Sequence, residues 1–274
     1  MAATTWEPSG NDALAVQLLK TNTWSCYCGP SLWNFSADRL KDTMHELLLE
    51  LPKSGRHRLR LLLRPCNLLG CLRGRAEQAF FCVATKRAER SHAAGVVLND
   101  EKHVLVFLSG PSELRIQLAV WLGAEFKTSL HRLELAPWEL SMTAGLGVSL
   151  LNLGQNTQEY CLEVGMGDMK LRFSEEVVEQ LAPPALLTEN GSRALLLALC
   201  RHAHRHVLPV PYEEMPLHSV NLPSLFSVNH EGTVEVHASA PIPQLVKCLS
   251  NAAEHTLFGI LPLVFEEEDT ESMQ

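Results

Sequence analysis

Four short apolar segments lie between residues 57 and 108, with turn residues between them. Residues 57–64 alternate leucine at 59, 61 and 63 with mainly arginine, which is the period of a strand with one face toward a core. Residues 79–84, 95–98 and 104–108 are further apolar strand candidates, and turns are expected at 90–92 and 99–100. Because neighbouring strands joined by short turns pair antiparallel, this stretch predicts a meander.

Helical periodicity occurs on both sides of the meander. A short helix is expected around residues 12–19, and a strand is expected at 23–28. Ser36 suits the N-cap of a helix that Pro52 ends, and residues 112–126 carry leucine and tryptophan on one helical side. The first half therefore predicts the order α-β-α-β-β-β-β-α.

The second half contains two hairpin patterns and two further helical patterns. Strands at 160–164 and 169–173 flank Gly165-Met-Gly-Asp168, and strands at 220–228 and 233–238 flank Asn229-His-Glu-Gly232. Helices are expected over 192–206 and 244–257, and an apolar strand is expected over 257–265.

Together these patterns predict an α+β fold of mainly antiparallel sheets flanked by helices. Two lobes are expected, with a C-terminal dimerisation region. Residues 1–150 form an N-terminal α/β lobe with the basic strand, residues 151–265 form a C-terminal α/β lobe, and residues 266–274 form an acidic disordered tail.

Composition narrows the class of protein. The chain has 274 residues, of which 46% are hydrophobic, so a packed core is expected. No apolar run approaches the roughly 20 residues of a membrane helix, and the first residues lack a signal pattern. The eight cysteines are scattered through mostly apolar segments, which favours buried reduced thiols. The sequence therefore predicts a soluble intracellular protein without a membrane partner.

Charge is distributed unevenly along the chain. The net charge is −8, yet residues 53–90 carry ten Lys or Arg against two Glu, a local balance of +8. Basic side chains on one strand and its neighbouring turns are typical of a surface that contacts phosphates. The alternative is a solvated face that pairs with acidic groups. The candidate DNA-binding residues are Arg56, Arg58, Arg60, Arg64, Arg73, Arg75, Lys86 and Arg87.

Motifs of catalysis and metal binding are incomplete. His202 and His206 share a helical face, but a zinc-protease motif needs a Glu between them, and no Cys-x-x-Cys pair exists to form a structural site. Gly165-Met-Gly-Asp168 leads into a strand, so it favours a hairpin turn over a phosphate-binding loop. The sequence therefore predicts no enzymatic activity, no metal and no cofactor.

Several collinear stretches resemble the centromere protein L (CENP-L) family. The family's opening has a Trp-containing strand before a Leu-x-x-Phe stretch and a long helix, and its later part has a His-x-His-Arg-His helix and a hairpin. The stretches that carry the resemblance are Leu18–Trp24 with Leu32–Phe35, Asn67–Gly70 with Ala79–Cys82, Phe126–Leu146, and Arg201–His206 with His230–Gly232.

This resemblance implies a non-enzymatic scaffold subunit in the nucleus, at the centromere and kinetochore. It implies a heterodimer with a centromere protein N (CENP-N)-like subunit inside the constitutive centromere-associated network, beside CENP-C and the CENP-H/I/K/M group. Centromeric DNA is an expected partner of the assembled complex, which functions in chromosome segregation at mitosis.

The family pairs through its C-terminal sheet region, and apolar residues on predicted strands at 217–265 agree with a partner that covers a strand edge or an apolar face. The candidate interface residues are Leu225, Phe226, Val234, Val236, Leu257, Ile260, Leu263 and Phe265. The alternative function is a DNA-binding module or a nucleic-acid-processing enzyme that uses the strand around Arg58–Arg64 directly.

Overall fold

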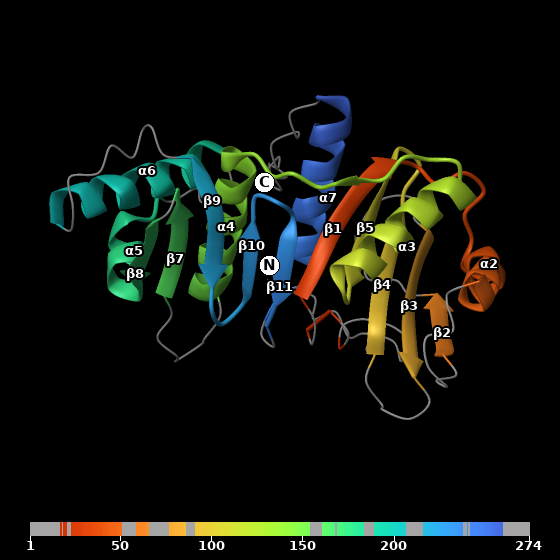
Figure 1. Ribbon diagram of the computed structural model, residues 1–274. Coiled ribbons are helices and arrows are strands. Elements are labelled where there is room, and N and C mark those ends of the chain that lie inside the picture. Colours follow the sequence, from red (N-terminus) through yellow and green to blue (C-terminus); the bar gives the residue numbers. More distant parts are fainter. Residues whose placement is uncertain are drawn as a thin grey trace, which may run out of the picture. The chain divides into compact units, whose positions relative to one another are not determined.

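The computed structural model describes most of the chain between residues 17 and 259 (Figure 1). The described residues are 17, 19–20, 23–50, 59–65, 77–85, 91–153, 161–167, 169–183, 189–206, 216–237, 240 and 242–259. Within these ranges the side chains of 45–50, 59–65, 77, 80, 82–85, 91–92, 152–153 and 189 are not described.

The fold is α+β, with helices and a mostly antiparallel sheet, as the sequence predicted. The chain divides into two compact units, and each combines segments that are far apart in the sequence. Unit 1 comprises residues 1–133 and 231–238, and unit 2 comprises residues 134–230 and 239–274. Unit 2 begins at Glu134, before the predicted boundary at residue 150. Residue 150 itself lies inside a helix of unit 2.

Unit 1 contains the predicted meander. The strands run in the order β2-β3-β4-β5-β1-β11, and β6 also pairs with β1. The bounds are β1 Thr23–Pro30, α2 Ala37–Glu50, β2 Leu59–Pro65, β3 Glu77–Thr85, β4 Ser91–Asn99, β5 His103–Ser109, α3 Ser112–Glu125, β6 His131–Arg132 and β11 Thr233–Val236. The described residues 17, 19 and 20 are helical, so the predicted order of the first half is confirmed wherever the structure describes it.

Two different segments complete one edge of β1. β11 pairs with residues 23–25 of β1, and β6 pairs with residues 27–28. At Cys26, between them, the amide donates to the Gly232 carbonyl at 2.8 Å, and the Cys26 carbonyl accepts from the Leu133 amide at 2.9 Å. A strand that follows residue 230 therefore belongs to the N-terminal unit, which a simple division into two halves does not predict.

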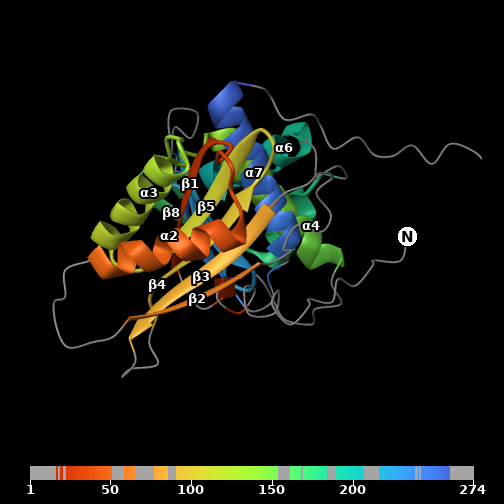
Figure 2. The same ribbon diagram turned by 90° about the vertical axis from the view of Figure 1, so that its right-hand side faces the viewer.

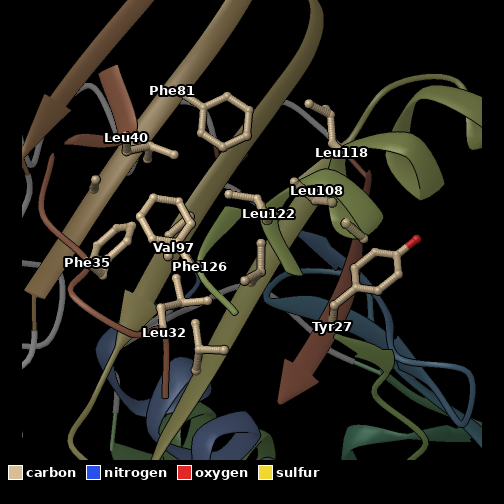
Figure 3. Packing of buried hydrophobic residues seen from close by; sticks show 14 of the residues in the cluster. Tyr27, Leu32, Phe35, Leu40, Phe81, Val97, Leu108, Leu118, Leu122 and Phe126 are labelled. Carbon is tan, nitrogen blue, oxygen red and sulfur yellow. The ribbon is translucent and has the colours of Figure 1, made fainter. Parts of the chain in front are cut away.

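Helices α2 and α3 lie on the same face of the unit 1 sheet (Figure 2). Leu118 and Leu122 project from α3 toward the strands, where they meet Phe81, Val97 and Leu108 (Figure 3). The rings of Phe35 and Phe126 pack edge to face with centroids 5.3 Å apart. Burial of these large side chains provides the main stabilisation of this unit, at roughly 25 cal/mol for each Å² removed from water.

Unit 2 has a second group of strands, in the order β10-β9-β7-β8, with β8 at the end. Its central helix α4 contacts α6, α7, β9 and β10. The bounds are α4 Pro137–Leu153, β7 Cys161–Met166, β8 Met169–Ser174, α5 Glu175–Leu181, α6 Glu189–His206, β9 Leu217–Leu222, β10 Phe226–Asn229 and α7 Ile242–Phe258. The predicted hairpin at residue 165 is confirmed, but β7 continues to Met166, so the turn is shorter than expected.

Three predictions for the second half differ from the structure. The segment 220–228 is two antiparallel strands, β9 and β10, because the chain turns at residues 223–225. A strand was expected over residues 257–265, but its first two residues belong to helix α7, which continues to Phe258. Helices α4 and α5 were not predicted at all. α4 is buried on several sides, so its sequence lacks the polar face that gives a helix its 3.6-residue pattern.

Candidate protein-interaction site

An exposed tryptophan in unit 1 follows the end of β1. The amide of Trp33 donates to the Phe126 carbonyl at 3.0 Å, and the Leu32 amide donates to the Asn99 side-chain oxygen at 2.7 Å, so the backbone of this turn is held on both sides. Leu32 and Phe35 point into the core, whereas the Trp33 side chain is 57% exposed. The local fold therefore presents this ring to solvent while it anchors both neighbours.

Two cations lie over the Trp33 ring. The Lys127 ammonium is 4.4 Å from the ring centroid, and the Arg39 guanidinium is 5.9 Å from it. Arg39 also donates to Glu125 Oε1 at 3.2 Å, which fixes the guanidinium beside the ring. Cation–π contacts of this kind contribute about 0.5–1 kcal/mol at exposed sites.

The backbone at this site adopts an uncommon conformation. Within the described residues, Asn34 and Lys127 have φ values of 51° and 52° and are the non-glycine residues with positive φ. Such a conformation costs on the order of 1 kcal/mol or more for a residue with a Cβ. Asn34 follows Trp33 in the sequence, and Lys127 contacts the Trp33 ring through its ammonium group.

Helix α3 extends this surface. Ile116 is 57% exposed and Val120 is 67% exposed, and they lie one helical turn apart on the side opposite Leu118 and Leu122. Ala124 is exposed one turn further on. The outer side of α3 therefore carries three exposed apolar residues beside the exposed polar residues Ser112, Glu113 and Gln117.

Charged residues stand at the two ends of this face. Glu113 is exposed in the first turn of α3, and Lys127 is exposed just after its end. Neither forms an ion pair with another residue in the part of the chain that the structure describes. We call Trp33, Glu113, Ile116, Val120, Ala124 and Lys127 together the α3 surface.

Sequence reasoning assigned no role to the α3 surface. It recognised the apolar side of α3 that faces the core, and the structure buries Leu118 and Leu122 there with Leu114 and Trp121 packed against the same core. The available signal was Ile116 and Val120 on the opposite side. Nothing in the sequence pattern indicated that Lys127 contacts Trp33, because the two residues are separated in the sequence by the whole β2–β5 meander.

Most of the candidate DNA-binding residues fall outside the described part of the chain. Arg60 and Arg64 lie in β2, where they pair in register with Ala84 and Phe80 of β3, and β2 is at the end of the strand order. Their side chains are among those not described. The residues outside the described ranges are Arg56, Arg58, Arg73, Arg75, Lys86 and Arg87.

The candidate interface residues of the C-terminal region divide into three groups. Leu225, Phe226, Val234 and Val236 are buried within this chain, so they are not solvent-facing in the structure. Leu257 is half-buried on α7 rather than on a strand. Ile260, Leu263 and Phe265 lie outside the described residues. Next to them, the side chain of Phe258 is 46% exposed at the end of α7.

Burial favours the protonated form of three described thiols, Cys26, Cys200 and Cys248. It raises the pKa of Cys26 far above its usual range, raises that of Cys248 to about 12 and also raises that of Cys200. A nucleophilic cysteine needs the opposite shift, because the thiolate is the reactive species. The five described cysteines are free, and Cys26, Cys28 and Cys200 are buried.

A buried carboxyl group lies at the start of α4. Glu139 is 3% exposed; its Oε2 accepts from the Ala136 amide at 2.7 Å, and its Oε1 is 3.2 Å from His255 Nδ1. Burial raises the pKa of Glu139, although the Ala136 amide and His255 favour the charged form. Trp138 packs edge to face on His255 with centroids 4.9 Å apart. This cluster joins α4 to α7.

The remaining motifs have structural positions. His202 and His206 lie at the end of α6 with ring centroids 4.5 Å apart. No group of three potential metal ligands occurs among the described residues. Gly165 lies inside β7, and Gly167 adopts positive φ at the hairpin turn. None of the helices in the described ranges is long and apolar enough to cross a membrane.

No family model matches the sequence, and no curated protein matches it.

Proposed function

We propose that this chain is a non-enzymatic scaffold subunit of the inner kinetochore. The observation that carries the proposal is the exposure of large apolar side chains in both units: Trp33, Ile116 and Val120 in unit 1, and Leu197 and Phe258 in unit 2. Grouped apolar side chains at a surface favour contact with other proteins. Burial raises the pKa of the Cys26 and Cys248 thiols, which is the opposite of the shift that activates a nucleophilic cysteine.

The collinear stretches that resemble the CENP-L family support a specific assembly. In this proposal the chain pairs with a CENP-N-like subunit in the nucleus and joins CENP-C and the CENP-H/I/K/M group at the centromere. Pairing involves the C-terminal region, in which Phe258 is exposed and apolar residues continue along the sequence to Phe265. The basic segment of residues 53–90 then faces centromeric DNA as part of the complex.

The experiment is affinity recovery of the tagged full chain from dividing cells, followed by mass spectrometry. A stoichiometric CENP-N-like chain is the expected partner. Phe258→Asp should reduce its recovery at least tenfold, because a buried unpaired carboxylate in an apolar contact costs more than 1.4 kcal/mol. Ser129→Asp, which introduces the same charge at an exposed residue of unit 1 outside the α3 surface, is the control and should leave this recovery unchanged.

Recovery of other proteins without a CENP-N-like chain would refute the kinetochore assignment. Turnover of nucleic acid by the purified chain would refute the non-enzymatic part of the proposal and would favour the nucleic-acid-processing alternative.

A further inference from the structure

The outer side of α3 carries two large exposed apolar side chains, Ile116 and Val120. Of the six exposed residues of α3, Ile116, Val120 and Ala124 are apolar, Glu113 is charged, and Ser112 and Gln117 are polar and uncharged. A second body that covers Ile116 and Val120 removes their apolar area from water, which favours association.

The positions of these residues are symmetric about Val120. Ile116 precedes Val120 by four residues and Ala124 follows it by four; Glu113 precedes it by seven and Lys127 follows it by seven. In an antiparallel pair of identical helices, residues equally distant from the centre lie opposite each other. A two-fold axis at Val120 therefore sets Ile116 against Ala124 of the second copy, and it brings Glu113 toward the end of the other helix, where Lys127 lies two residues beyond Glu125.

Each of these pairs is complementary. The large Ile116 meets the small Ala124, so the two helices can approach closely at both contacts. The acidic Glu113 meets the basic Lys127 twice, once at each end of the pair. Trp33, which lies beside Lys127, then adjoins the start of the other α3 and adds an aromatic side chain that is 57% exposed in one copy.

We propose that two copies of this chain associate through an antiparallel, two-fold contact of α3 with α3. The inference rests on the proposed role of the α3 surface as a protein-binding site, and it names the occupant as a second copy. The contact covers little more than one helix and one tryptophan on each side. Such an interface is smaller than the roughly 800 Å² per partner of a standard complex, so the dimer is expected to be weak and concentration-dependent.

Sedimentation analysis of the full chain over a range of concentrations tests self-association. A reversible dimer is expected, with dissociation in the micromolar range, whereas a monomer up to about 100 µM would overturn the proposal. Val120→Asp should abolish the dimer, because it puts two carboxylates next to each other at the two-fold axis. Circular dichroism verifies that this variant is folded.

Charge exchange tests the register. Glu113→Lys alone and Lys127→Glu alone each create two like-charge contacts, and each should weaken the dimer about tenfold. The double variant in one chain should restore wild-type association. An equimolar mixture of the two single variants should also associate, because each copy then supplies the charge that the other lacks. Failure of both restorations would overturn the two-fold register.

A cysteine at the axis provides a direct geometric test. Val120→Cys should form a covalent dimer under mild oxidation, while the wild-type chain measures the background from its own thiols. Arg193→Cys, at an exposed position on α6, is the control and should not exceed that background. Equal cross-linking of the two variants would contradict the proposed contact.

These outcomes are separable from those of the kinetochore assignment. A chain that forms the α3 dimer but recovers no CENP-N-like subunit would refute the assembly and leave the self-association standing. A chain that recovers the CENP-N-like subunit but stays monomeric would refute the self-association alone. Loss of that recovery in Val120→Asp would show that α3 binds the other subunit instead, which would also overturn the two-fold dimer.

Discussion

Glu139 illustrates how one buried carboxyl group connects pH to the stability of unit 2. Burial raises its pKa, so the folded chain binds this proton more tightly than the unfolded chain, whose glutamate has a pKa of about 4.3. The stabilising contribution is therefore complete below pH 4.3 and is lost as the pH rises through the raised value. His255 and Cys248 are the titratable groups that interact with this carboxyl group.

Glu139→Gln removes this titration but keeps an oxygen that accepts from the Ala136 amide. The free energy of unfolding of the variant, relative to the wild type, should rise between pH 4 and pH 7. Urea unfolding at several pH values measures this difference. Parallel stability curves for the two proteins would contradict the direction of the pKa shift.

Gly232 and Gly259 both have positive φ, but only one has a neighbour at the position of a Cβ. At Gly232, where φ is 67°, an added Cβ would overlap the Leu133 carbonyl oxygen, whereas at Gly259, where φ is 63°, no atom lies within 4 Å. Gly232→Ala should therefore destabilise the fold by roughly 2–4 kcal/mol, and Gly259→Ala by about 1 kcal/mol. The difference between the urea midpoints of the two variants measures the effect of the contact with the Leu133 carbonyl oxygen. Equal costs would show that φ, rather than the Leu133 contact, determines the effect.

At the scale of single elements, α2 depends on its N-cap. The Arg39 amide donates to Ser36 Oγ at 3.1 Å, as the sequence pattern predicted. Ser36→Ala should lower the free energy of unfolding by about 1 kcal/mol, because an orphan amide of the first turn loses its acceptor. Ser129→Ala, at an exposed position outside the helices and strands, is the control and should change the unfolding free energy by less than about 0.5 kcal/mol. Equal effects would exclude a capping role.

At the scale of the whole molecule, the uneven charge makes a quantitative prediction about DNA. The triple variant Arg58→Ala, Arg60→Ala and Arg64→Ala, assembled with a CENP-N-like partner, should bind DNA more weakly at any sequence, since phosphate contacts position without specifying. The slope of log affinity against log salt should fall by about one unit for each lost contact. The isolated chain, with a net charge of −8, should bind DNA poorly. An unchanged affinity and slope would show that this face contacts water or an acidic protein.

The local periodicity of the sequence determined the meander β2–β5, the α2 and α3 helices, most of α6 and α7, and the hairpin of β7 and β8. Helices α2, α6 and α7 each bury one side, so their 3.6-residue pattern survives in the sequence. β5 is buried throughout, and it was recognised as a short apolar run between turn residues. The N-cap at Ser36 was likewise a local signal.

Only the tertiary structure decided the remaining features. Helix α4 is surrounded by other elements, so it has no polar side to reveal its period. Pairing of β11 with β1, across more than two hundred residues, depends on hydrogen bonds between strand edges and leaves no mark on composition. The contact of Lys127 with Trp33 and the exposure of Ile116 and Val120 likewise depend on how whole elements pack together. A sequence pattern encodes which side of an element is apolar, whereas the packing of whole elements decides which apolar side remains uncovered.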